Sequence, residues 1–310
     1  MIINNLTTAI SLVSLKTVES LNNIIEASPH KLHFELSYEM KPTLIEQMRP
    51  KLIDSVVSIH AACPNVEFFP NLASHDESVI TQSFKDLDMS LDTAVSFGAN
   101  NLVLHPGYST DKAIPSDNEL RQNLFSSEEF TPYIWNAKGS ICDINYIDSP
   151  KYKEFSNQAI KNLGKFAQIC EKRGVTLAVE NLNPRVGYLF QTPNEMVKLI
   201  EKVDCSICLD VGHLWLSSCL YGFNYLEGIR TILATNKVAT THLHSNMSRP
   251  VSDGEKVILE DNHSSLNKYN FPYKEVIKEI AKSKANMVLE VKESPLENHK
   301  LLINELSKLK

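Results

Sequence analysis

Eight short apolar runs recur along the chain, and each one stops at a turn or at a polar residue. Apolar runs of this length are typical of parallel strands that are buried on both faces. The segments between them carry apolar residues at helical spacing, so the pattern predicts strands and helices in alternation. The predicted strands cover residues 9–14, 31–37, 56–60, 101–105, 175–180, 206–210, 238–244 and 286–290.

Eight such units in one chain predict an α/β fold, a single (β/α)8 TIM barrel. A barrel of this kind reaches a length of 310 residues, and no linker or change of composition divides the chain, so we expect one domain over residues 1–310. A doubly wound open sheet is the alternative. It would not predict ligand-type residues at the ends of six successive strands.

Capping signals bound several of the predicted helices. Gly98 and Gly174 act as C-terminal stops, and Thr192-Pro193 is an N-cap with proline at the first helical position. We predict helices over residues 17–27, 78–97, 151–173, 193–203, 221–234, 271–283 and 297–308, with residues 43–48 in one more, and a polar loop over 245–269.

The alternation breaks between residues 108 and 150, directly after the fourth strand. A stretch of this length without a clean period is usually a functional insertion or a lid, and it follows a strand end, where barrel enzymes bind substrate. Two interpretations of its aromatic residues stay open: they cover a substrate, or they pack the insertion onto the barrel. These residues are Phe125, Phe130, Tyr133, Trp135 and Tyr146.

The composition is that of an ordinary globular protein, with 43% hydrophobic and 22% charged residues. A net charge of −6 gives no overall electrostatic attraction for nucleic acid. No apolar run approaches the roughly 20 residues of a membrane span, and the N-terminus lacks the marks of a secretory signal. The six cysteines are scattered, mostly in apolar runs. We therefore expect buried, reduced thiols and a cytoplasmic location.

Residues suited to metal binding gather at the predicted strand ends. In a βα-barrel these ends meet at one rim, so the residues converge without being adjacent in sequence. All are nitrogen or oxygen donors for a divalent first-row metal, which predicts at least one bound metal. They are His60, His105, Glu180, Asp210, His213, His242, Asp261, His263 and Glu290. His244 alternates with His242, so we expect it to point to the opposite face.

Two chemistries fit these donors. Glu180, Asp210, His242 and Glu290 can hold one metal that polarises a carbonyl, while Glu180 and Glu290 move a proton as acid and base. The other five donors can hold further metals, and clustered metals clamp a phosphate. Zinc is expected if several metals bind, and manganese or cobalt if only one does.

The order of the motifs resembles the xylose isomerase-like TIM-barrel superfamily, which includes endonuclease IV and many sugar isomerases and epimerases. The resemblance runs from about residue 56 to 293, apart from the insertion. Singly each motif is weak, but in this order they are specific. They are the His60 strand followed by Asn71-Leu-Ala-Ser74, then Leu-His105-Pro-Gly107, Val-Glu180-Asn-Leu182, Leu-Asp210-Val-Gly-His213, His242-Leu-His244, Asp261-Asn-His263 and Leu-Glu290.

Resemblance to endonuclease IV, which binds three zinc ions and cuts DNA at abasic sites, implies a role for all nine donors. His60 and His105 would bind one zinc. Asp210, His242 and Glu290 would bind a second, with Glu180 bridging the two. His213, Asp261 and His263 would bind the third.

Several departures favour the sugar isomerase and epimerase branch. The endonucleases typically carry Cys where this chain has Gly212, and Asp-Val-Gly-His and His-Leu-His are typical of the sugar branch. Asn267 and Tyr269 replace glycines usual in both branches. The insertion is not expected beside a DNA-binding groove.

The main hypothesis is a metal-dependent isomerase or epimerase acting on a small sugar, sugar phosphate or polyol. The first alternative is an endonuclease IV-like zinc phosphodiesterase that acts on abasic DNA. The second is a barrel that keeps its metal and binds a ligand without catalysis.

Overall fold

Eight parallel strands form a closed barrel in the computed structural model, which describes residues 2–3, 6–249 and 259–309. β2 pairs with both β13 and β3, and this closes the ring. The (β/α)8 prediction is therefore confirmed, and the open sheet is wrong. The strands, in their order around the barrel, are β2 (Leu6–Ser11), β13 (Asn286–Leu289), β12 (Val238–Leu243), β11 (Ser206–Asp210), β10 (Thr176–Glu180), β6 (Asn101–Leu104), β4 (Val56–His60) and β3 (His33–Leu36).

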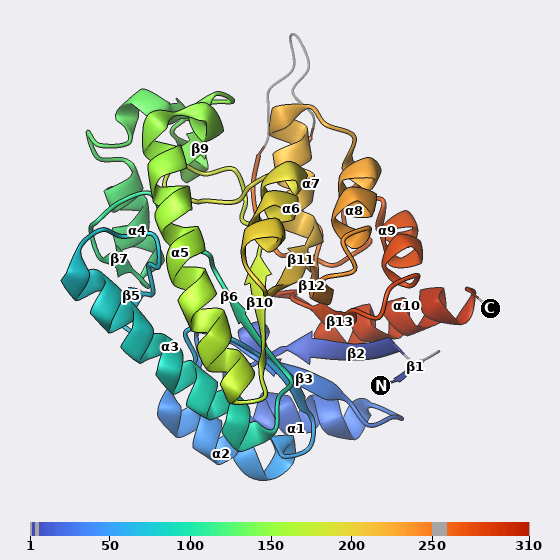
Figure 1. Cartoon of the computed structure of the whole chain (residues 1–310). Helices are drawn as coiled ribbons and strands as arrows, with labels where there is room; N and C mark the ends of the chain where they lie inside the picture. The colour runs from blue at the N-terminus through green and yellow to red at the C-terminus, as the bar shows by residue number, and fades with distance from the viewer. Residues whose placement is uncertain (1, 4–5, 250–258, 310) are drawn as a thin grey trace.

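Helices surround the barrel (Figure 1). β1 (Ile2–Ile3) pairs antiparallel with β2, and the last helix lies beside both of these first strands. None of the described helices is both long and apolar enough to cross a membrane. The main helices are α1 (Val18–Ala27), α2 (Pro42–Leu52), α3 (Glu77–Phe97), α5 (Pro150–Lys172), α6 (Pro193–Lys202), α7 (Val211–Tyr221), α8 (Tyr225–Leu233), α9 (Tyr273–Ile280) and α10 (Pro295–Ser307).

The predicted caps are present. Gly98 has the left-handed φ of 66° at the end of α3, and Gly174 has φ 71° directly after α5. Thr192 and Glu195 form a capping box at the start of α6, with Pro193 at the first helical position.

Two local predictions differ from the structure. The first strand begins three residues earlier than predicted, and Leu12–Ser14 form a 3₁₀ turn. The helix predicted over 221–234 is present as α8, but a second helix, α7, starts immediately after β11 and was not predicted. Asp210 caps α7 by accepting a hydrogen bond from the backbone N–H of His213 at 2.6 Å. Residues 250–258 of the predicted loop lie outside the described part of the chain.

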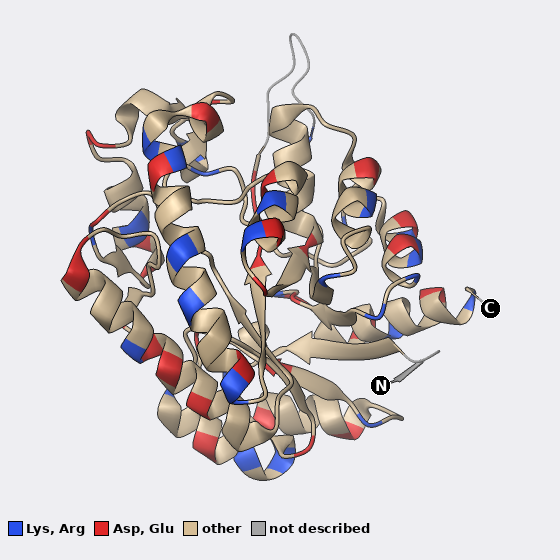
Figure 2. Cartoon of the chain, viewed as in Figure 1, with Lys and Arg blue, Asp and Glu red and all other residues tan. Residues whose placement is uncertain are grey.

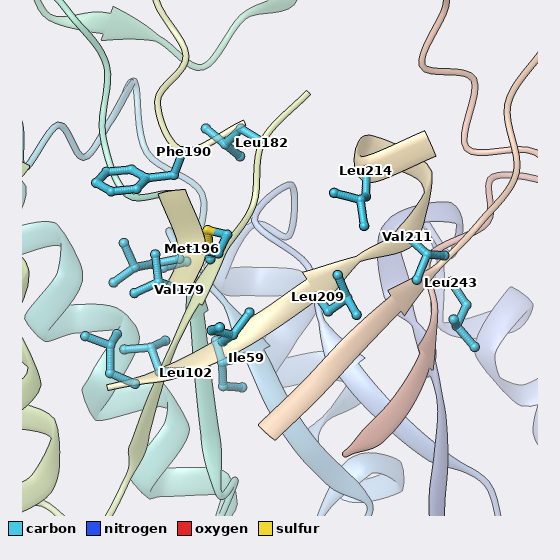
Figure 3. Packing of buried hydrophobic residues seen from close by; sticks show 14 of the residues in the cluster. Ile59, Leu102, Val179, Leu182, Phe190, Met196, Leu209, Val211, Leu214 and Leu243 are labelled. Atoms are coloured by element: carbon cyan, nitrogen blue, oxygen red, sulfur yellow. The ribbon is translucent and has the colours of Figure 1, made fainter. Parts of the chain in front are cut away.

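Strand alternation separates the core from the barrel interior. The outward residues of the strands, such as Ile59, Leu102 and Leu209, pack against the helices in the main core (Figure 3). The inward residues Val103, Ala178 and Cys208 form a separate small cluster inside the barrel. Because side chains alternate with a period of two, the last inward positions of β10 and β11 are Glu180 and Asp210. Because of this alternation, the side chains of these last residues point into the mouth of the barrel.

The insertion after β6 is ordered and packs on the loop that follows β10. The backbone N–H groups of Cys142 and Val186 donate across this boundary, to Pro184 O at 3.1 Å and Ser140 O at 2.9 Å. The Tyr146 hydroxyl accepts from Gly187 N at 2.8 Å. The insertion contains β7 (Ile114–Pro115), α4 (Asn118–Phe125), β8 (Ile134–Asn136), β9 (Ile141–Cys142) and three short 3₁₀ turns, Thr131–Tyr133, Lys138–Ser140 and Tyr146–Asp148.

Three of the five insertion aromatics named in the sequence analysis serve packing. Phe125, Phe130 and Tyr146 are buried, and Phe125 packs against both Phe130 and Tyr188. Trp135 is 42% exposed. None of the five lines the large cavity described below. The packing interpretation therefore holds for Phe125, Phe130 and Tyr146.

Charged side chains of both signs are interspersed on the outer helices (Figure 2).

The six cysteines are all buried and unpaired, as predicted.

Candidate functional site

All nine predicted donor residues meet at the C-terminal end of the barrel. Each comes from the end of a strand or from the segment that follows it. His60, Glu180 and Asp210 are the last residues of β4, β10 and β11, and His242 lies near the end of β12. His105 and Glu290 directly follow β6 and β13, and His213 lies in the first turn of α7. Asp261 and His263 come from the segment between β12 and α9.

The ring of His242 lies at the centre of the site. Its Nδ1 atom is buried and has no hydrogen-bond partner. Three carboxylate oxygens face this nitrogen, from Glu290 at 3.4 Å, Glu180 at 3.6 Å and Asp210 at 3.8 Å. Buried carboxylates this close to one another need a positive charge between them. One imidazole nitrogen with three carboxylates is a donor set that fits a divalent cation.

Glu35 is not among the predicted donors. It contacts Nε2 of His242, the ring nitrogen on the side away from the three carboxylates. It lies on β3 and is fully buried. Its Oε1 atom is 3.0 Å from His242 Nε2, an ion-pair contact that does not have hydrogen-bond geometry. Ser58 Oγ donates a hydrogen bond to its other oxygen at 2.6 Å. A carboxylate behind an imidazole fixes which ring nitrogen is left free to bind a metal. Strand alternation places Glu35 on the inward face, and that signal was available in the sequence.

A second cluster forms around Asp261. Its Oδ2 atom is 3.3 Å from both His213 Nε2 and His263 Nε2. Asn183 donates a hydrogen bond to the same oxygen at 3.0 Å. His244 completes a group of four side chains whose donor atoms lie within 4.8 Å of one another. This cluster could therefore hold a metal ion as well.

The expectation that His244 points away from the site is wrong. Residues two positions apart on a strand point to the same face, so alternation directs His244 to the side of His242 and not away from it. Its Nε2 lies 3.1 Å from Asp210 Oδ1, and its ring stacks on His263 with centroids 3.9 Å apart. The ring occupies the space beside Gly212, where a Cβ atom would lie 2.1 Å from His244 Cε1.

His60 and His105 lie on the other side of Glu180. The Glu180 Oε2 atom is 3.0 Å from His60 Nε2 and 3.7 Å from His105 Nε2. The second nitrogen of each ring is held, by the carbonyl of Ala61 at 2.8 Å and by the Tyr108 hydroxyl at 2.9 Å. Glu180 therefore lies between this histidine pair and His242, and its three neighbours could share a metal with it.

Burial and mutual charge set the ionisation of these groups. Burial lowers the pKa of His105 to about 3, so its imidazole is neutral at pH 7, as metal binding requires. Burial opposes charge on Glu180 too, but His242 and the other histidines outweigh it and hold its pKa well below the usual value. Burial lowers the pKa of His263, but the Asp261 carboxylate beside it acts in the opposite direction. The resulting pKa is about 9. The Glu180 carboxylate is therefore ionised at pH 7, and the protonated His263 offsets part of the negative charge around Asp261. A metal that binds here would release such protons.

A cavity of about 830 Å³ opens over these clusters, a size common for small-molecule sites. His60, His105, Glu180 and Glu290 line its floor. Its wall includes residues of the insertion, among them Arg121, Gln122 and Lys138. The insertion therefore contributes polar residues to the cavity, which the sequence pattern did not reveal.

Comparison with known proteins agrees with this architecture. A family model described as xylose isomerase-like TIM barrel matches residues 22–310. Uncharacterized protein MJ1614 of Methanocaldococcus jannaschii is 23% identical over 248 residues, which are 80% of this chain and 75% of that protein. A D-tagatose 3-epimerase-like protein superposes with a TM-score of 0.68 at 19% identity, covering 98% of both chains. An L-ribulose 3-epimerase superposes with a TM-score of 0.61 at 14% identity, covering 96% of this chain and 86% of that one.

Proposed function

Because the chain belongs to the xylose isomerase-like TIM-barrel family, we propose that it is a metal-dependent isomerase or epimerase acting on a sugar-like substrate. The observation that carries the proposal is the unpartnered His242 Nδ1 atom, faced by Glu180, Asp210 and Glu290. The structural similarity to sugar epimerases supports the same class of reaction.

In this proposal, Glu180, Asp210, His242 and Glu290 hold one divalent metal. When bound, the metal acts as a Lewis acid on a substrate carbonyl and its neighbouring hydroxyl. β11 and β12 lie between β10 and β13 in the barrel, so Glu180 and Glu290 approach the centre from two sides. One glutamate removes a proton from the carbon beside the carbonyl, and the other returns a proton to the opposite face or to the neighbouring carbon.

A zinc phosphodiesterase is the second candidate, and the Asp261 cluster is the observation that favours it. Together with the histidine pair at Glu180, that cluster provides donors for further metals. Clustered metals stabilise both the attacking and the leaving oxygen of a phosphodiester.

Proton exchange and metal content together test the proposal. Protein purified without chelator is analysed for metals, then incubated with ketoses in deuterium oxide. The expected result is about one metal per chain and deuterium at the carbon next to the carbonyl, lost after chelation and restored by manganese or cobalt. About three zinc ions per chain, with nicking of an abasic duplex and no deuterium uptake, would establish the second candidate instead.

Replacing Glu35 by glutamine is expected to weaken metal binding by roughly 10- to 100-fold, the usual effect of losing a carboxylate behind a ligating histidine. The amide has a similar shape but no charge, so it holds His242 less firmly in one tautomer. Affinity is measured by competition with a chelating dye. Glu46→Gln on α2, where Glu46 pairs with Arg49, is the matched surface control. Equal metal affinity for Glu35→Gln and the parent would remove the supporting role.

A further inference from the structure

Asn181 directly follows Glu180 at the end of β10 and has no exposed surface. It is not one of the residues that line the cavity in the described part of the chain. A substrate in the cavity therefore does not touch it, and any part that Asn181 takes in the site is exerted through the residues it contacts.

The side chain of Asn181 continues the pairing between β10 and β11 where their backbones stop pairing. The last backbone pair of this ladder is Glu180 with Cys208, whereas β11 continues to Asp210. Asn181 Oδ1 accepts a hydrogen bond from the Asp210 N–H at 2.9 Å, and Asn181 Nδ2 donates to the Asp210 carbonyl at 2.9 Å. Buried backbone groups need such partners. An amide side chain can satisfy both, because it carries a donor and an acceptor.

These two hydrogen bonds hold the Asp210 backbone from one side of β11. On the other side of the strand, Asp210 lies opposite His242 in the ladder with β12. The Asp210 carboxylate thus extends from a backbone that is held on both sides, and its Oδ2 atom lies 3.8 Å from His242 Nδ1. Two bonds to one planar amide fix orientation as well as distance, so Asn181 sets how this carboxylate faces the His242 nitrogen.

The backbone carbonyl of Asn181 contacts a third donor residue, His213. It accepts a hydrogen bond from His213 Nδ1 at 3.1 Å. Because a carbonyl can only accept, Nδ1 carries the hydrogen, and the other ring nitrogen, Nε2, faces Asp261 Oδ2 at 3.3 Å. Asn181 therefore adjoins Glu180, Asp210 and His213 at once. These three residues form one of the groups whose donor atoms all lie within 4.8 Å of one another.

We propose that Asn181 is a positioning residue for the metal site, and that its amide holds Asp210 in the orientation in which this carboxylate binds the divalent ion together with Glu180. The inference rests on the proposed function, which assigns a metal to these carboxylates. Alanine in place of Asn181 would leave the buried N–H and carbonyl of Asp210 without their partners, and the Asp210 backbone would be free to shift.

The test compares Asn181→Ala with the parent protein and with Asn162→Ala as the matched control. Asn162 is also buried, and its Nδ2 donates to the Leu72 carbonyl at 2.9 Å, but it lies on α5. Manganese, cobalt and zinc are titrated one at a time by competition with a chelating dye, and unfolding in denaturant is measured in parallel. We expect Asn181→Ala to weaken metal binding by roughly 10- to 100-fold, the usual effect of removing a residue that supports a metal ligand. Asn162→Ala is expected to bind metal like the parent, although both variants lose stability.

The visible spectrum of the cobalt-loaded protein gives a second readout, because it depends on the geometry of the metal ligands. We expect this spectrum to change in Asn181→Ala and to stay unchanged in Asn162→Ala. In Asn181→Ser the hydroxyl can keep one of the two hydrogen bonds, so its metal affinity should lie between those of the parent and Asn181→Ala. If the alanine variant does not fold, Asn181→Ser is judged against the parent by the same two readouts.

Lowered stability with unchanged metal affinity and an unchanged cobalt spectrum would show that Asn181 is purely structural, and would overturn the inference. Deuterium exchange that persists in such variants would leave the proposed isomerase or epimerase intact. Weaker metal binding in Asn181→Ala supports the inference even if no sugar exchanges deuterium and the proposed function fails. A parent protein that binds none of the three ions would overturn both proposals.

Discussion

Glu180→Gln and Glu290→Gln are each expected to reduce turnover by roughly 10³-fold, because either change removes a group that moves a proton. Glutamine has nearly the same shape as glutamate, but its amide neither accepts nor releases a proton at neutral pH. Deuterium incorporation from solvent and the rate of product formation are measured together. A variant that lacks only the proton-returning group is expected to keep more deuterium exchange than turnover.

Both glutamates also face His242 and are proposed metal ligands. The experiment must therefore distinguish a loss of bound metal from a loss of proton transfer. Each variant is assayed at saturating metal, and its bound metal is measured after the assay. Glu227→Gln on α8, where Glu227 pairs with Arg230 on the surface, controls for the substitution itself. Near-normal turnover in both Glu180→Gln and Glu290→Gln would disprove the acid–base assignment.

Gly212→Ala is expected to destabilise the protein by roughly 1–3 kcal/mol, the usual cost of overpacking a buried site. Alanine normally stabilises a helix relative to glycine, by about 0.5–1 kcal/mol. Here the new Cβ atom would overlap the His244 ring, which must then leave Asp210. The free energy of unfolding is measured in denaturant, and the histidine is followed by NMR.

Gly164→Ala is the matched control for this change. Gly164 also lies inside a helix, α5, but a Cβ atom there meets nothing within 4 Å. This variant should therefore gain stability as Gly212→Ala loses it. Equal, stabilising effects at the two positions would show that His244 moves aside without cost.

The barrel and the position of its donors could be predicted because both follow from strand periodicity. An apolar strand that ends in His60 or Asp210 must present that residue at the barrel mouth. Helix α7 could not be found in the same way, because most of its residues are buried and no amphipathic stripe marks it. Asp210 was interpreted as a strand-end donor, and its second role as a helix cap was missed.

Residues that depend on packing between distant segments were the other omissions. His244 lies two residues after His242 and so points to the same side, and its ring fits there because Gly212 leaves room for it. Arg121 lies in the irregular insertion, where no periodicity indicates which side chains face the cavity. Arg185 was noticed as a cation, but only the structure shows its unpartnered Nε atom.

The hydrogen bonds between the insertion and the loop after β10 also limit how the protein can move. Cys142 and Val186 join the two segments through their backbones, and Tyr146 binds Gly187. The insertion therefore cannot move away from the cavity as an independent lid, because the segment that carries Arg185 would have to move with it. Under the proposed function, a substrate therefore enters a cavity whose wall on this side is fixed by backbone hydrogen bonds.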